Sequence, residues 1–259
     1  LSAYGVVLYR TAIASAFLIL WQHRKLLIPG RDALAFTLTG AVIGAHWITF
    51  FLAVKVANVS ICMAGMATLS LWTAILEPLM VRGRKLRPID LAFGLVVAIG
   101  VATIFRSELQ FSEGFLIALL SAVFAAVFSI INSFHINKGH YLVITTYEML
   151  GAALFTGLYI ILFDPSTNLQ ATPSDWLWLT LLAVFCTVVA FSHYIELLKR
   201  LSVYTINFAN NLEPVYGILL AAIILNDHDH LHQGFWIGAT IIIVSICAYP
   251  LVRRKFVIR

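Results

Sequence analysis

Charged residues are scarce in this sequence of 259 amino acids. Lysine, arginine, aspartate and glutamate make up only 11% of it, whereas soluble domains carry about 25%. Hydrophobic residues make up 61%, and the mean hydropathy is +0.94. A water-soluble core could not bury so much apolar surface. The composition therefore excludes a soluble globular protein and predicts a membrane protein with several helical spans.

Cysteine is also rare, and its placement argues against a disulfide framework. Cys62, Cys186 and Cys247 all lie within apolar runs rather than in loops, and their number is odd. The sequence has no CxxC pair, no GxSxG motif and no phosphate-binding glycine loop. We therefore expect no cofactor, no metal and no enzyme of these classes.

Nine apolar segments are each long enough to cross a bilayer as a helix. Short breaks with turn and capping residues separate them, so no soluble domain is expected. The sequence thus predicts an all-α, multispanning transmembrane helical bundle. The predicted spans are 3–22, 33–55, 60–81, 88–106, 113–135, 141–163, 176–198, 203–225 and 234–252.

Basic residues are concentrated in alternate breaks between these spans, and the other breaks are mainly acidic. By the positive-inside rule, the basic breaks and the C-terminus are cytoplasmic, in a plasma membrane such as a bacterial inner membrane. Basic residues in short loops do not indicate nucleic-acid binding. They are Arg24, Lys25, Arg31, Arg82, Arg84, Lys85, Arg87, Lys138, Lys199, Arg200, Arg253, Arg254, Lys255 and Arg259.

A weak internal repeat relates two parts of the chain. The segments from Ser60 to Gly94 and from Ser202 to Gly238 share one order of turn, apolar span, polar break and glycine-containing span. The matching spans cross the membrane in opposite directions, as in many secondary transporters. We therefore expect two inverted halves, residues 1–106 and 107–259, in one membrane domain. Leu1 would lie outside the cell, so we expect a tenth span before it; nine native spans are the alternative.

The segment 205–225 is unusually polar for a transmembrane span. It contains Asn207, Asn211 and Glu213, and Pro214 interrupts its hydrogen-bond ladder. In a helix, both asparagines and Pro214 would share one face. Polar groups at this depth are tolerated only against protein or a water-filled cavity. The segment predicts a translocation cavity with Pro214 as its hinge; the alternative is a kinked helix whose amides bind neighbouring helices.

Other polar and aromatic residues are expected at similar depth. His46 and Phe50 would share a face of a helix that Gly40 and Gly44 open to close packing, although His46 could be purely structural. Glu148 and Glu213 could each bind a proton for coupling or a cationic group of the substrate, or be neutral acids bonded to a neighbouring helix. The predicted solute-binding residues are His46, Trp47, Phe50, Trp72, Asn132, His193, Asn207, Asn211 and Glu213.

Residues 227–232 alternate between acids and histidines, the donor types that hold divalent metals. They lie in an external turn, and no HExxH pattern accompanies them. We expect a solvated, pH-sensitive loop rather than a metal site.

Four stretches resemble the EamA family of the drug/metabolite transporter superfamily. They are YRTA at 9–12, HWITFFLAVK at 46–55, LEPVY at 212–216 and GFWIG at 234–238. The resemblance runs over nearly the whole chain. It implies two inverted five-helix halves around a central cavity, with the first helix of the first half absent. The sequence departs from the family at 69–72, which reads LSLW where the family often has proline.

The resemblance implies a secondary transporter that exports or exchanges small metabolites. Aromatic and amide residues with few charges favour amino acids or amphipathic and aromatic solutes, moved by alternating access. A proton or a counter-solute would be the coupling partner, and membrane lipid would surround the bundle. The alternative is an intramembrane enzyme that uses His46, His193 or residues 227–232 on a lipid-borne substrate, although no convergent nucleophile and base indicate one.

Overall fold

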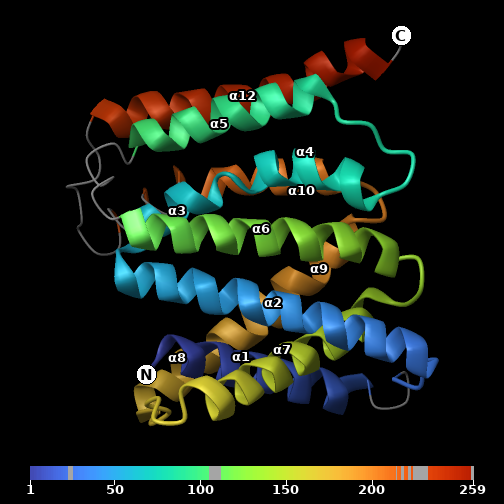
Figure 1. Ribbon diagram of the computed structural model, residues 1–259, viewed down its shortest axis with the longest axis vertical. Coiled ribbons are helices and arrows are strands. Elements are labelled where there is room, and N and C mark those ends of the chain that lie inside the picture. The colour runs from blue at the N-terminus through green and yellow to red at the C-terminus, as the bar shows by residue number, and fades with distance from the viewer. Residues whose placement is uncertain are drawn as a thin grey trace. The chain divides into compact units, whose positions relative to one another are not determined.

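Helices make up nearly all of the chain that the structure describes. The computed structural model describes residues 1–22, 26–104, 112–213, 215–216, 219–220, 223 and 233–257. Within these residues there is no strand, and Figure 1 shows the order of the elements. The elements are α1 (Ala3–Gln22), α2 (Gly30–Val56), α3 (Val59–Met66), α4 (Leu69–Met80), α5 (Pro88–Ile104), α6 (Ser112–His135), α7 (Tyr141–Phe163), α8 (Pro173–Ala183), η2 (Val184–Val189), α9 (Ala190–Leu197), α10 (Val203–Ala209), η3 (Asn210–Leu212) and α12 (Gln233–Val257).

Seven helical stretches in the described residues are long and apolar enough to cross a membrane. Helix α5 is apolar but shorter. These helices confirm the predicted all-α multispanning bundle. The predicted span at 203–225 is described only in part, as α10, the 3₁₀ segment η3 and a few residues beyond it. Pro214, the predicted hinge, lies outside the described residues.

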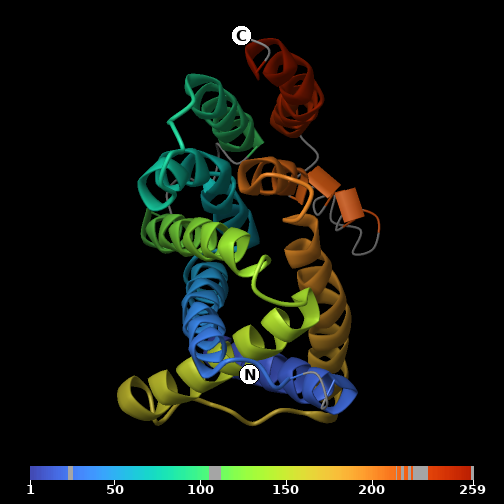
Figure 2. The same ribbon diagram turned by 90° about the vertical axis from the view of Figure 1, so that its right-hand side faces the viewer.

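Two of the predicted spans are not regular α-helices. The span expected at 60–81 is broken at Ala67–Thr68, between α3 and α4. The span expected at 176–198 passes through the π-helix η2 between α8 and α9, and Figure 2 shows these three elements as one continuous rod. A π segment adds a residue to the helical turn, and such segments are frequent at functional sites.

The chain divides into two compact units, each described here by itself. Unit 1 contains residues 1–52 and 127–202, and unit 2 contains residues 53–126 and 203–259. Each unit therefore takes segments from both predicted sequence halves, and helices α2 and α6 each contribute residues to both units. The division into halves at residue 106 stays a prediction.

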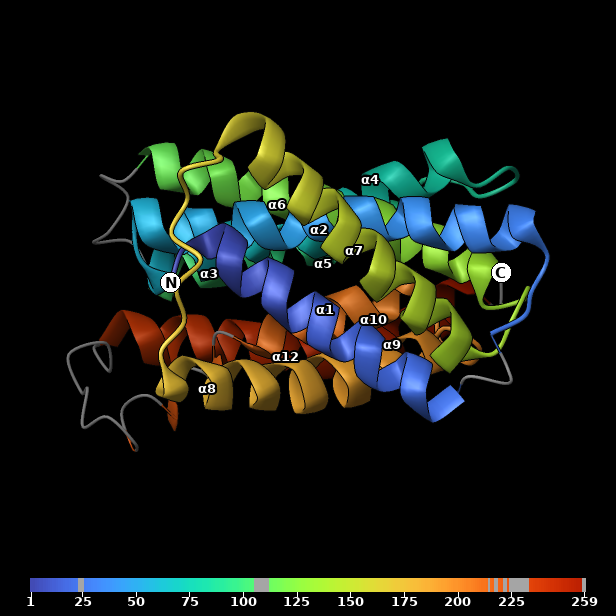
Figure 3. The same ribbon diagram turned by 90° about the horizontal axis from the view of Figure 1, so that it is seen from below.

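In unit 1, helix α7 packs against both α1 and α2. Figure 3 shows α1 lying across α7. Helix α2 approaches α7 so closely that a Cβ on Gly40 would overlap the carbonyl oxygen of Glu148, and a Cβ on Gly151 would overlap the carbonyl oxygen of Thr37. One turn further along α2, a Cβ on Gly44 would lie 3.3 Å from the carbonyl oxygen of Ala152, a tight contact without overlap. The predicted close-packing face of Gly40 and Gly44 is thus confirmed.

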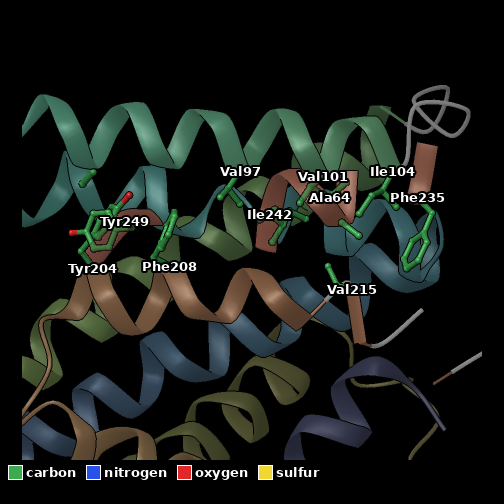
Figure 4. Close-up of a cluster of buried hydrophobic side chains, with 13 residues drawn as sticks. Ala64, Val97, Val101, Ile104, Tyr204, Phe208, Val215, Phe235, Ile242 and Tyr249 are labelled. Carbon is green, nitrogen blue, oxygen red and sulfur yellow. The ribbon is translucent and has the colours of Figure 1, made fainter. Parts of the chain in front are cut away.

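In unit 2, helices α5 and α12 lie side by side (Figure 1). A Cβ on Gly238 would overlap the carbonyl oxygen of Gly100, so glycine permits this contact. Figure 4 shows the core beside it, where Val97 and Val101 of α5 face Ile242 of α12. Residues from α10 complete this core. They are Tyr204 and Phe208, whose rings stack 5.5 Å apart between centroids.

The outer faces of the helices carry large apolar side chains. On α7, Leu154, Leu158 and Ile161 are 59%, 56% and 70% exposed, and their spacing places them on one helix face. Lipid tails are the medium that such a face suits. Helix α7 thus presents Gly151 to α2 and an apolar face to its surroundings.

Candidate functional site

The described residues of unit 1 contain a buried cluster of aromatic rings around His46 and Trp47. The His46 ring centroid lies 6.2 Å from that of Phe50 and 5.5 Å from that of Phe128. The Trp47 ring lies 6.0 Å from that of Phe191 on α9. His46, Trp47, Phe128 and Phe191 are each at least 91% buried. The predicted pairing of His46 with Phe50 is therefore present, inside a larger cluster that also includes Tyr194.

An arginine lies directly on this aromatic cluster. The Cζ atom of Arg10 is 4.0 Å from the Trp47 ring centroid, which is a cation–π contact. Its Nε and Nη2 atoms donate to Thr187 Oγ1 at 3.2 and 2.9 Å. Arg10 is 6% exposed. Sequence reasoning did not single it out as a site residue, although an arginine inside an apolar span was a sufficient signal.

Thr187, the hydrogen-bond partner of Arg10, lies in the π-helix η2. Its hydroxyl donates to the carbonyl of Leu182, five residues earlier, at 3.1 Å. The same oxygen accepts from both Arg10 nitrogens. A single threonine hydroxyl thus links α1 to the widened turn of the helix.

Glu148 of α7 is fully buried in unit 1, among polar residues from α6. Its Oε2 accepts a long hydrogen bond from Asn132 Nδ2 at 3.5 Å, and its Oε1 lies 4.0 Å from His135 Nδ1. The Oε1 atom accepts no hydrogen bond from the described residues. The structure therefore brings the predicted residues Glu148 and Asn132 together, and adds His135, which the sequence reading had not selected.

His193 is the predicted site residue of unit 1 that stands apart. Its side chain is exposed, and its Nδ1 lies 2.8 Å from the carbonyl oxygen of Val189. Its ring approaches that of Tyr141 at 6.5 Å rather than the aromatic cluster. The reason is helical phase, because His193 follows the buried residues Phe191 and Ser192 and projects outward.

In unit 2 the two predicted asparagines bind helix α4. Asn207 Nδ2 donates to Thr73 Oγ1 at 2.9 Å, and Asn211 Nδ2 donates to Ser70 Oγ at 3.2 Å and to the Phe208 carbonyl at 3.0 Å. Both asparagines are buried. The sequence allowed two roles for these amides, binding solute or binding neighbouring helices, and these bonds correspond to the second role.

The other predicted residues of unit 2 have different settings. Trp72 of α4 is half-buried, and its buried indole Nε1–H donates to no acceptor in the described residues. Glu213 follows η3 and is exposed. Pro214 and the acid–histidine segment 227–232 fall outside the described residues. Among the residues that are described, no group of three metal-ligating side chains occurs.

Comparison with known proteins identifies the fold and the family. The chain is similar to a solved structure whose description reads only "Crystal structure of protein". The alignment covers 99% of this chain and 90% of the other chain, with a TM-score of 0.79 and 19% sequence identity. At this identity the likeness shows the fold alone. No curated protein matches the chain. The model of the EamA-like transporter family matches residues 112–249. Because that match covers more than half of the sequence, the chain belongs to the EamA-like transporter family.

Proposed function

We propose that this chain is a secondary transporter that moves small metabolites across the plasma membrane by alternating access, with its C-terminus in the cytoplasm. Family membership supports transport of small solutes. The observation that carries the proposal is the buried polar set in unit 1. Arg10, His46 and Glu148 are at least 93% buried within membrane-spanning helices. Ionisable groups inside spans mark solute or ion pathways by default.

The aromatic cluster fits the apolar part of an amphipathic solute. The Trp47 ring contacts Arg10, and the rings of His46 and Phe191 lie 6.5 and 6.0 Å from it between centroids. Aromatic faces bind both apolar and cationic groups without needing fixed hydrogen bonds. Amino acids and other amphipathic or aromatic metabolites therefore fit His46, Trp47 and Phe50, and the distinction among them rests on the polar groups nearby.

Replacing Trp47 by alanine is expected to reduce uptake about tenfold, because it removes the cation–π contact and the aromatic surface together. The purified protein is first screened with a metabolite panel by thermal shift. Counterflow of a stabilising, labelled metabolite is then measured in proteoliposomes. Trp178→Ala is the matched control, because Trp178 lies on α8 of the same unit and is 65% exposed. Vesicles that never accumulate a binding metabolite would refute transport, and equal rates for both variants would refute the role of Trp47.

Asn211 is a proposed solute contact that also bonds to Ser70. If Asn211 binds the solute, Asn211→Ala should lower the flux strongly. Ser70→Ala leaves the Asn211 amide in place and should lower the flux only a little. If the amide only joins η3 to α4, both variants lose the same bond between these elements and behave alike. The measurement is counterflow rate beside thermal stability for each variant. Equal losses of flux would remove Asn211 from the site; the same comparison with Thr73→Ala tests Asn207.

A further inference from the structure

Arg10 carries a buried charge for which the described residues supply no counterion. Among the described residues it is the only lysine or arginine in the buried class. Its hydrogen bonds go to the neutral hydroxyl of Thr187, and no described carboxylate pairs with it. The undescribed part of unit 1, residues 23–25, reads HRK and contains no acid.

A buried charge of this kind is expensive, since removal from water is not offset by an opposite charge. A cation–π contact and a hydroxyl acceptor recover part of that cost. Arginines inside membrane spans are rare, and by default they mark solute or ion pathways. A negatively charged group on the transported solute would supply the counterion that Arg10 lacks among the described residues.

The described contacts of the guanidinium take up one face and one edge, and leave its second edge without a described acceptor. Trp47 covers one face of its plane, and Thr187 takes the edge formed by Nε and one N–H of Nη2. Nη1 donates to no described residue. The edge formed by Nη1 and the second N–H of Nη2 is a planar fork, which matches the two oxygens of a carboxylate.

We propose that Arg10 binds the carboxylate of a solute whose apolar body lies against Trp47 and its aromatic neighbours. This inference rests on the proposed function and specifies its substrate class. The single positive charge matches a monocarboxylate better than a doubly charged phosphate, since no second buried lysine or arginine occurs among the described residues. Thr187 and Trp47 act by holding the guanidinium in the orientation that presents its fork.

The test compares acids with their uncharged amides: benzoate with benzamide, and leucine with leucinamide. Binding to the full chain in detergent is measured by calorimetry, which needs no flux. In each pair the acid is expected to bind at least about tenfold more tightly, as for a hydrogen-bonded pair of opposite charges. Arg10→Gln should abolish this preference, and Arg10→Lys, which keeps the charge but lacks the fork, should retain only part of it.

Arg84→Gln is the matched control, because Arg84 is a half-exposed arginine paired with Glu77, and it should bind like the wild type. If Arg10→Gln does not fold, the wild-type pairs and Arg10→Lys decide the outcome. The proposal fails if the wild type binds neither member of the pairs, binds both equally, or prefers phenyl phosphate to benzoate. It also fails if Arg10→Gln retains the preference. Acid binding without vectorial movement would refute transport but leave the carboxylate site standing.

Discussion

Replacing Gly40 by alanine is expected to lower the free energy of unfolding by about 3 kcal/mol, the upper range for overpacking a tight contact. The added Cβ would overlap the carbonyl oxygen of Glu148, which is backbone and cannot turn aside. Helices α2 and α7 would have to separate, and the contacts of Gly44 and Gly151 along the same face would loosen with them. Thermal unfolding in detergent, followed by tryptophan fluorescence, measures the loss.

Gly157→Ala on α7 is the control for this effect. A Cβ there meets only Leu8 Cδ1, at 3.7 Å, and alanine favours helix over glycine by about 1 kcal/mol. This variant should therefore be as stable as the wild type or slightly more so. Equal stability of Gly40→Ala and Gly157→Ala would show that α2 and α7 do not pack as closely as described.

Glu148→Gln is expected to abolish proton-driven accumulation of solute, down to the level of protein-free liposomes, while solute exchange without a proton gradient persists. The amide is nearly the same size as the carboxyl group and can still accept from Asn132, but it cannot carry a proton. Glu148 is fully buried. Its Oε1 atom lies 4.0 Å from His135 Nδ1 and accepts no hydrogen bond from the described residues. A buried acid in this setting is suited to take up and release a proton.

The measurement compares uptake of the same labelled solute with and without an imposed pH gradient. Glu77→Gln serves as the control, because Glu77 of α4 pairs with Arg84 at 3.5 Å near the end of its helix. That variant should keep both activities. Proton-driven accumulation that survives in Glu148→Gln would exclude this residue from coupling. Glu213, the other predicted proton site, would then be the remaining carboxyl to test.

Hydropathy alone located the membrane helices well, because long apolar runs must satisfy their backbone internally and have few alternatives. The predicted spans 3–22 and 141–163 have the bounds of α1 and α7. The break at Ala67–Thr68 was not anticipated, since it contains no proline or glycine. There the backbone N–H and the hydroxyl of Thr68 both donate hydrogen bonds to the Gly65 carbonyl. Hydrophobic periodicity does not reveal such local hydrogen bonding.

Side-chain partners were harder to predict than helices. The sequence identified His46, Trp47 and Phe50 as a unit because helical spacing determines which neighbours share a face. It did not bring in Phe128 and Phe191, which come from distant helices and carry no local signal. Arg10 entered only through the YRTA stretch and not as a site residue, because its partners Trp47 and Thr187 lie on other elements. Pairings between distant segments depend on helix packing, which a single sequence does not specify.

The widened turn at η2 also determines which side chains of its helix point inward. Leu179, Ala183, Thr187, Phe191 and Ile195 are all buried and recur every fourth residue. In a regular α-helix, four residues overshoot a full turn by about 40°, so this row would wind steadily round the rod. The extra residue of the π segment takes up much of that drift. Shortening the segment by one residue would rotate α9 against α8 and turn Phe191 away from the Thr187 side, so the length of this stretch is itself constrained.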